Sequence, residues 1–156
     1  MEISRILAPT DLSPASDGAL ATAADLANRL GAGLTLLHVV REQDLEALTS
    51  ARVPPRPIDF VCQDVEAALI AQYRRVVPVE ARRRLRVEPA VAVGTPVVEI
   101  LRAAQAEDAD MIVMATHGRA GLARIVKGSV AEQVVHRSSC PVVTVRPAQA
   151  PALAAA

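Results

Sequence analysis

Aromatic side chains are nearly absent from this sequence. Phe60 and Tyr73 are the only two aromatic residues among 156, and there is no tryptophan. Since 51% of the residues are hydrophobic, the core must be filled by alanine, valine, leucine and isoleucine. The shortage also argues against a surface that stacks on nucleic acid bases, because such surfaces are built from aromatic rings.

A net charge is missing as well. The 17 lysine and arginine residues balance 17 aspartate and glutamate residues, so the formal charge is zero. This balance disfavours nucleic-acid binding through bulk positive charge. The densest basic run, Arg82 to Arg84 with Arg86, follows a helical pattern, and we interpret it as a solvated helix face.

Long apolar runs and paired cysteines are also lacking. No run approaches the roughly 18 residues of a membrane span. The N-terminus carries Glu2, Arg5 and Asp11 where a signal peptide would have its apolar core. Cys62 and Cys140 lie far apart without a CxxC motif, so we interpret them as two buried thiols in a reducing compartment. The expected localisation is cytoplasmic, with no membrane and no nucleic acid as partner.

What the sequence does contain is an alternation of short apolar segments with segments of helical periodicity. Most of the apolar segments are continuously apolar, as in strands that are buried on both faces. The expected strands are 5–10, 34–40, 86–93, 111–116 and 141–147. The alternation predicts a three-layer α/β fold around a doubly wound parallel sheet. We expect a single domain over residues 1–147 and a flexible tail over 148–156. Pro89 predicts that the third strand lies at an edge.

A serine or threonine directly before a proline marks two expected helix starts. Ser13-Pro14 and Thr95-Pro96 each place a hydroxyl before a proline, the pattern of a capped helix N-terminus. We therefore expect both hydroxyls to cap helices.

The last expected strand is apolar on both faces and carries no charge before Arg146. At the edge of a sheet, such a strand would be an unprotected template for pairing. Pairing with the same strand of a second copy would remove that exposure. The sequence therefore predicts a homodimer through residues 141–146.

A glycine-rich segment, "MATHGRAGLARIVKGSV" (114–130), contains two arginines and a lysine but no carboxylate. It follows an expected strand and precedes an expected helix. In open α/β sheets ligands bind at the carboxyl ends of strands, and a helix N-terminus can hold a phosphate. Gly118 and Gly128 would let the backbone approach an anion closely, and Arg119, Arg124 and Lys127 would add positive charge.

An ordinary loop can also explain this segment. Ser129 and Glu132 form an S-x-x-E capping box, which by itself accounts for a serine at this position. Neither the P-loop pattern nor G-x-G-x-x-G is present. Spacing alone therefore leaves both interpretations open.

The segment "THGRAGLARIVKGSVAEQVVHRSSCPVVTVRP" resembles the C-terminal signature of the universal stress protein family. "RILAPTDLSPAS" and "LTLLHVV" resemble the first two strands of that family, and the resemblance spans residues 3–147. Its nucleotide-binding members carry G-x-x-G, nine residues, and then G-[ST]. Here nine residues separate Gly118 from Gly128 and Ser129 follows, but Ala115 replaces the first glycine. The implied fold is a five-stranded parallel sheet of order 3-2-1-4-5, of the adenine nucleotide alpha hydrolase-like type.

The resemblance also implies which residues contact the nucleotide. We expect ATP, ADP or AMP to be bound together with Mg²⁺ but without a dedicated metal site in the protein. The implied contacts are Asp11 and the backbone of Val39 at the adenine; Pro9, Thr10, Met114 and Ala115 at the nucleoside; and Gly118, Gly128, Ser129 and Val130 at the phosphates, with His117 and Arg119 beside them.

Two of these residues also have purely structural interpretations. Asp11 either accepts a hydrogen bond from adenine or caps its own loop in an Asx turn. His117 either hydrogen-bonds a phosphate or fixes the loop around it.

The implied function is an ATP-binding protein that acts as a dimer in stress response or signalling. We find no catalytic motif and expect no enzyme activity. Ala115 keeps a nucleotide-free interaction module of the same fold open as an alternative. A weak ATP phosphohydrolase is the other alternative, because a metal-bound triphosphate is partly activated.

Overall fold

The computed structural model describes residues 2–50, 57–116 and 129–147. Its strands form one parallel sheet in the order β3-β2-β1-β4-β5, which confirms the fold class and the implied strand order. The strands are β1 (Arg5–Pro9), β2 (Gly33–Val40), β3 (Val87–Val93), β4 (Met111–Ala115) and β5 (Val142–Val145). The helices are the 3₁₀ turn η1 (Pro14–Ser16), α1 (Asp17–Leu30), α2 (Glu42–Ser50), α3 (Ile58–Val76), α4 (Val79–Arg82), α5 (Pro96–Ala106) and α6 (Val130–Arg137).

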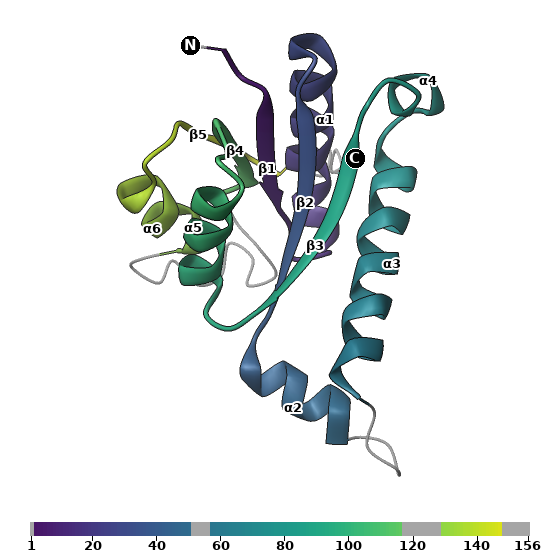
Figure 1. The fold of residues 1–156 in the computed structure, drawn as a ribbon, viewed down its shortest axis with the longest axis vertical. Coiled ribbons are helices and arrows are strands. Elements are labelled where there is room, and N and C mark those ends of the chain that lie inside the picture. Colours follow the sequence, from purple (N-terminus) through teal and green to yellow (C-terminus); the bar gives the residue numbers. More distant parts are fainter. Residues whose placement is uncertain (1, 51–56, 117–128, 148–156) are drawn as a thin grey trace, which may run out of the picture.

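Helices cover both faces of the sheet (Figure 1). One hydrophobic cluster joins the sheet to α1 and α3 and includes Leu69 and Tyr73, whereas a second joins it to α5 and α6 and includes Val134. Both clusters are built almost entirely from aliphatic residues, as expected from the scarcity of aromatics. Cys140 packs against the second cluster. Both Cys140 and Cys62 are only half-buried, whereas the sequence predicted that both thiols would be buried.

The edge position of β3 is confirmed, and the backbone explains why Pro89 is tolerated there. Leu34 N–H donates to the Arg86 carbonyl and Gly94 N–H donates to the Val40 carbonyl, each at 2.9 Å. Even-numbered residues of β3 therefore direct their backbone groups toward β2, because these groups alternate along a strand. The nitrogen of Pro89 faces outward, where its missing hydrogen removes no hydrogen bond within the sheet.

The expected helix caps were wrong in detail. Neither Ser13 nor Thr95 makes a side-chain capping bond, and α1 begins at Asp17, after the 3₁₀ turn. The Ser13 hydroxyl donates instead to Asp11 Oδ1 at 2.6 Å. This charge-assisted hydrogen bond holds the hydroxyl beside the Asp11 carboxylate.

Asp110 ties the amino ends of β1 and β4 together. Its Oδ2 accepts from Ser4 N–H at 2.8 Å, Ser4 Oγ at 3.0 Å and Arg5 N–H at 3.0 Å. These hydrogen bonds, chiefly that of the Ser4 backbone, lower the pKa of the Asp110 carboxyl below its usual 3.8. The ionised form is therefore favoured in the folded protein.

Asp110→Asn is expected to lower the melting temperature by a few degrees at neutral pH, since a neutral amide is a weaker acceptor. A lowered folded pKa means that the stabilisation is present above the unfolded pKa near 3.8 and is lost as pH falls through the folded value. Thermal unfolding of both proteins between about pH 7 and about pH 2 measures this. The gap in melting temperature is expected to shrink in acid, and a constant gap would contradict the assignment.

Candidate functional site

The sheet reverses its strand order between β1 and β4, because β2 and β3 lie beyond β1 whereas β5 lies beyond β4. In open α/β sheets ligands bind outside the carboxyl ends of the strands at such a reversal. We call the carboxyl ends of β1 and β4, with Pro9, Thr10, Met114 and Ala115, the switch point. Pairing of β1 with β2 continues to Pro9–Leu37, but pairing with β4 ends at Leu7–Ile112.

Pro9 explains why the pairing with β4 ends early. Thr10 N–H donates to the Leu37 carbonyl at 2.9 Å and Gly33 N–H donates to the Ser4 carbonyl at 2.8 Å. Even-numbered residues of β1 therefore face β2, and odd-numbered residues face β4. Pro9 directs its nitrogen toward β4 without a hydrogen to donate, so the ladder cannot continue past it.

The side of β4 that faces β1 presents backbone N–H and carbonyl groups to the switch point. Ile112 N–H donates to the Pro141 carbonyl at 2.9 Å, so even-numbered residues of β4 face β5. Val113 and Ala115 consequently direct their N–H and carbonyl groups toward β1. The Val113 carbonyl is the acceptor that an N–H at position 9 would reach. The switch point is thus lined by main-chain groups of β4 as well as by side chains.

The expected nucleoside residues divide between the two faces of the sheet. Met114 belongs to the cluster under α5 and α6, and Val39 packs against that cluster. Pro9 points to the same face, because it lies two residues after a member of the cluster. Thr10 and Ala115 point to the opposite face by alternation. The structure therefore brings Pro9, Val39 and Met114 to one face at the carboxyl end of the sheet.

Ala115, which stands in place of the first motif glycine, has an unstrained backbone. It lies in β4 and pairs with Val145. Among the described residues other than glycine, positive φ occurs at Leu12 (63°) and Asp108 (48°), and not at Ala115. A glycine is therefore not required here for its backbone freedom, and only the size of the methyl group distinguishes alanine from glycine.

The loop after β1 is fixed by Asp11. Its Oδ1 accepts from Ser13 N–H at 3.0 Å and from Ser13 Oγ at 2.6 Å, which forms an Asx turn. Leu12, in the left-handed region, donates its N–H to Thr10 Oγ1 at 3.1 Å. The structure shows the loop-fixing role of Asp11, and the hydrogen bond to adenine that the resemblance implies stays a prediction.

His38 of β2 also contacts the start of this loop, a role that the sequence did not predict. Its Nδ1 lies 2.8 Å from the Thr10 carbonyl oxygen. Since a carbonyl can only accept, Nδ1 carries the proton. In the neutral ring Nε2 is then an acceptor.

Three buried polar residues lie beneath the same loop: Thr10, Ser16 and Gln72 are 8%, 3% and 5% exposed. Thr10 Oγ1 donates to Gln72 Oε1 at 2.9 Å and lies 2.8 Å from Ser16 Oγ. Gln72 Nε2 donates to Ser16 Oγ at 3.1 Å and to Asp17 Oδ1 at 2.9 Å. Sequence reasoning missed Gln72, although a polar residue within the apolar stripe of α3 was a usable signal.

An ion pair continues this network to the surface. Arg75 donates to Asp17 Oδ2 at 2.6 Å and to Oδ1 at 3.0 Å. The Arg75 hydrogen bond is the main reason that the pKa of Asp17 lies below its usual 3.8; burial opposes this shift, and the Gln72 hydrogen bond adds to it. Asp17 is therefore held ionised next to the buried amide.

Two of the expected phosphate contacts lie at the start of α6. Ser129 caps this helix, because its Oγ accepts from Glu132 N–H at 3.2 Å, which confirms the capping part of the S-x-x-E pattern. Val130 is the first residue of α6 and is 38% exposed. The other implied residues at the phosphates, His117, Gly118, Arg119 and Gly128, lie outside the described residues, as do Arg124 and Lys127.

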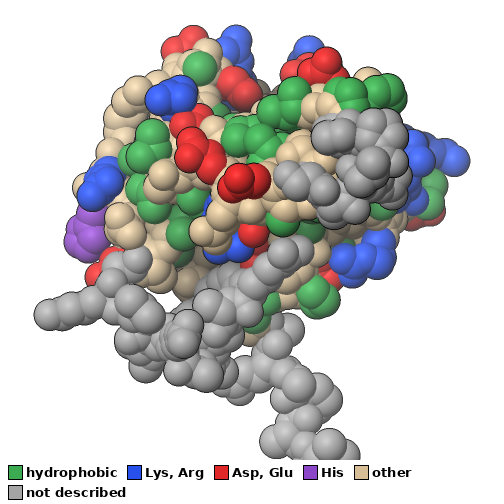
Figure 2. Space-filling model, turned by 90° about the horizontal axis from the view of Figure 1, so that it is seen from below, with side chains coloured by type: hydrophobic (Ala, Val, Ile, Leu, Met, Phe, Trp, Pro, Cys, Tyr) green, Lys and Arg blue, Asp and Glu red, His purple; other side chains and the backbone are tan. Residues whose placement is uncertain are grey.

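The face at the carboxyl ends of the strands is mixed in charge. Figure 2 shows acidic, basic and apolar side chains interspersed over its coloured part. Within the described segments, no group of three or more histidine, cysteine, aspartate or glutamate residues could hold a metal ion. No helix there is long and apolar enough to cross a membrane. An anion that binds this face would therefore have to be attracted by groups next to it, because the described part of the face carries charges of both signs.

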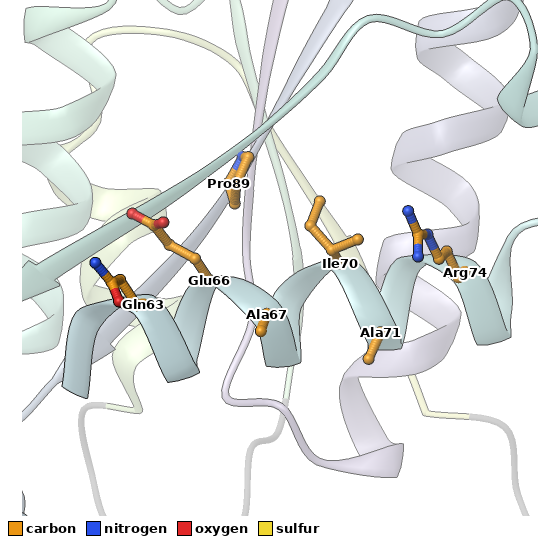
Figure 3. Close-up of a pocket in the computed structure, with 7 residues that line it drawn as sticks. All are labelled: Gln63, Glu66, Ala67, Ile70, Ala71, Arg74 and Pro89. Atoms are coloured by element: carbon orange, nitrogen blue, oxygen red, sulfur yellow. The ribbon is translucent and has the colours of Figure 1, made fainter. Parts of the chain in front are cut away.

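A groove of about 480 Å³ lies elsewhere, between α3 and β3 (Figure 3). It is lined by Gln63, Glu66, Ala67, Ile70, Ala71, Arg74 and Pro89. Its volume is suitable for a small molecule, but it contains none of the implied nucleotide contacts. Its single glutamate and single arginine give phosphates no net attraction, so we favour the switch point as the functional site.

Comparison with known proteins agrees with the fold. A sequence model described as "Universal stress protein family" matches residues 2–146. Universal stress protein YxiE of Bacillus subtilis is 32% identical over 145 residues, covering 91% of this chain and 98% of YxiE. The solved structure of MJ0577, a universal stress protein of Methanocaldococcus jannaschii, has a TM-score of 0.75 and 25% identity, covering 96% of this chain and 100% of the other. A universal stress protein of Archaeoglobus fulgidus in complex with dAMP has a TM-score of 0.61 at 20% identity, covering 94% and 100%, and is a likeness of fold.

Proposed function

Since the chain belongs to the universal stress protein family, we propose that it binds an adenine nucleotide at the switch point between β1 and β4. One observation carries the proposal. The β1–β4 ladder ends at Leu7–Ile112 beside a proline, at the place in the sheet where this fold class binds ligands. The dAMP complex of the Archaeoglobus fulgidus protein supports the choice of ligand class, because it shares the fold.

We propose that the adenosine lies on the face shared by Pro9, Val39 and Met114. These side chains are apolar and suit a base and a ribose that exclude water. The main-chain groups of Val39 and Ala115 would supply hydrogen bonds that recognise the base. Thr10 serves mainly to hold the loop, because its N–H and its hydroxyl both donate within the protein.

The phosphates are proposed to lie at the start of α6, contacted by Gly118, Arg119, Gly128, Ser129 and Val130, with His117 beside them. Ser129 Oγ accepts from the helix backbone and so keeps its own proton to donate to a phosphate oxygen. The positive end of the helix dipole adds attraction. Because the described residues contain no metal-binding cluster, Mg²⁺ would enter on the phosphates and keep most of its water ligands.

The proposed role is that of a cytoplasmic sensor that binds nucleotide rather than an enzyme that turns it over. Bound nucleotide would alter the surface that partner proteins recognise in stress response or signalling. We further propose that the protein is a homodimer through residues 141–146, because β5 is an edge strand without an internal proline or charge. A monomer at micromolar concentration in analytical ultracentrifugation would contradict the dimer.

Mass spectrometry of gently purified and then denatured protein tests the proposed ligand. Co-purified ATP, ADP or AMP is expected, and so is saturable binding when ATP with Mg²⁺ is titrated into the nucleotide-free protein. If no adenine nucleotide is released and millimolar ATP gives no response, the proposal fails.

Ala115→Gly separates nucleotide binding from the alternative of a nucleotide-free interaction module. We expect ATP affinity to change by less than about threefold, because Ala115 carries no backbone strain that a glycine would relieve. Isothermal titration calorimetry of both proteins measures it. A large gain in affinity would show that the methyl group blocks the site, and it would favour the interaction module.

A further inference from the structure

We infer that Gln72 of α3 is a positioning residue for the nucleotide site, acting through Thr10 on the loop that follows β1. This inference rests on the proposed function. Gln72 lies in a different layer of the molecule from the switch point, yet it is hydrogen-bonded to the residue that directly follows Pro9. Its side chain is 5% exposed, so its hydrogen bonds are shielded from water.

The orientation of the Gln72 amide follows from its neighbours. The Asp17 carboxylate can only accept, so the group that lies 2.9 Å from Asp17 Oδ1 must be Nε2. Oε1 then faces Thr10 and accepts the proton of Thr10 Oγ1. The ionised Asp17, bound by Arg75 from the other side, therefore fixes which way the amide points.

The remaining protons connect the same side chains to the loop backbone. Ser16 donates its single hydroxyl proton to the Ser13 carbonyl at 2.7 Å, because a carbonyl can only accept. Ser16 Oγ accepts from Gln72 Nε2 at 3.1 Å and lies 2.8 Å from Thr10 Oγ1. Gln72 thus joins Thr10 and Ser16 in one buried network, in which each bond polarises and strengthens its neighbours.

The network reaches the loop through Leu12. Thr10 Oγ1 accepts from the N–H of Leu12 at 3.1 Å while it donates its own proton to Gln72 Oε1. Leu12 has φ of 63°, a conformation that a leucine adopts only when its surroundings impose it. Without Gln72, the Thr10 hydroxyl could rotate and release Leu12, and with it the Asx turn of Asp11.

An apolar residue at position 72 would fit the buried face of α3 equally well, since Leu69 and Tyr73 on that face belong to the hydrophobic core. Removal of the amide is therefore compatible with folding. A polar network at this position fixes the direction of its hydrogen bonds, which a hydrophobic contact cannot do. We expect its main effect on the shape of the loop.

Gln72→Met is the test, because methionine keeps the length of the side chain and removes both polar groups. The matched control is Thr35→Val, which removes the 2.7 Å bond from Thr35 Oγ1 to Glu107 Oε2, away from this network. We expect Gln72→Met to weaken ATP binding about fivefold, the equivalent of one net hydrogen bond. Amide hydrogen exchange at Leu12, followed by NMR, is expected to accelerate about tenfold. Thr35→Val should leave both values unchanged.

The two readouts distinguish failure of this inference from failure of the proposed function. If the wild-type protein binds ATP and Gln72→Met binds it equally well, Gln72 has no positioning role. If no variant binds ATP, the proposed function fails, and unchanged exchange at Leu12 would overturn the inference as well. Ser16→Ala breaks the same network from the loop side, because it removes the hydroxyl between Gln72 and the Ser13 carbonyl, and it is expected to give the same two changes. If Gln72→Met does not fold, unchanged values in Ser16→Ala would overturn the inference.

Discussion

Replacement of Pro9 by alanine is expected to weaken ATP binding about tenfold and to leave the melting temperature almost unchanged. The alanine would direct a new N–H toward the carbonyl of Val113, because odd-numbered residues of β1 face β4. The β1–β4 ladder could then extend past Leu7–Ile112 into the switch point. A nucleotide would have to break that bond to enter, and a loss of about 1.4 kcal/mol corresponds to a tenfold weaker affinity.

The small effect on stability follows from two opposing contributions. Loss of the proline makes the unfolded chain more flexible, which destabilises the protein by about 0.4–1 kcal/mol. The additional hydrogen bond stabilises the folded state by about 0.5–1.5 kcal/mol. Isothermal titration calorimetry and thermal unfolding of the same preparation would separate the effect on affinity from the effect on stability.

Pro89→Ala is the matched control for Pro9→Ala. It also replaces a proline within a strand, but the restored N–H would point away from the sheet at the edge of β3. The effect on the unfolded chain is the same, and no ladder next to the nucleotide is extended. ATP affinity should be unchanged in this control. Equal losses of affinity in the two variants would show that Pro9 acts through general flexibility instead of strand separation.

Much of the fold could be predicted from local sequence. Continuously apolar strands predicted a parallel sheet with both faces covered, and Pro89 identified an edge, since each feature depends on residues close together in the chain. The caps at Ser13 and Thr95 failed because a hydroxyl before a proline does not reveal how that hydroxyl is oriented. At Ser13 the hydroxyl lies beside the carboxylate of Asp11, to which it donates.

The site was harder to predict, because its geometry depends on long-range contacts. Pro9 was expected at the nucleoside, but its effect on the ladder depends on which strands flank β1. Gln72 was missed because its partners Thr10, Ser16 and Asp17 are 62, 56 and 55 residues away. A single polar residue in an apolar stripe indicates buried hydrogen bonding, but it does not indicate the partner.

The two edges of the sheet differ in one respect that bears on assembly. At β3, the outward-facing nitrogen of Pro89 prevents a further strand from pairing there. At β5, Pro141 and Val145 direct their carbonyls to β4, since they accept from Ile112 and Thr116 at 2.9 Å. Even-numbered residues of β5 therefore direct their N–H and carbonyl groups outward, and none of those within Val142–Val145 is a proline.

Thr144→Pro places a proline in β5, as Pro89 does in β3, and it is expected to convert the proposed dimer into a monomer. Thr144 is exposed, and its N–H points away from β4, so a proline there removes no hydrogen bond within the sheet. Both copies lose an intermolecular donor. At about 1–1.5 kcal/mol each, two lost bonds raise the dimer dissociation constant on the order of 100-fold.

Sedimentation velocity over a concentration series measures this change, and circular dichroism checks that the fold is retained. Thr144→Val is the control, because it keeps the N–H and the β-branched shape and should remain dimeric. A folded Thr144→Pro protein that sediments as a dimer would place the interface elsewhere. Nucleotide affinity should be similar in monomer and dimer, because the residues proposed to contact the adenosine belong to β1, β2 and β4 of a single chain.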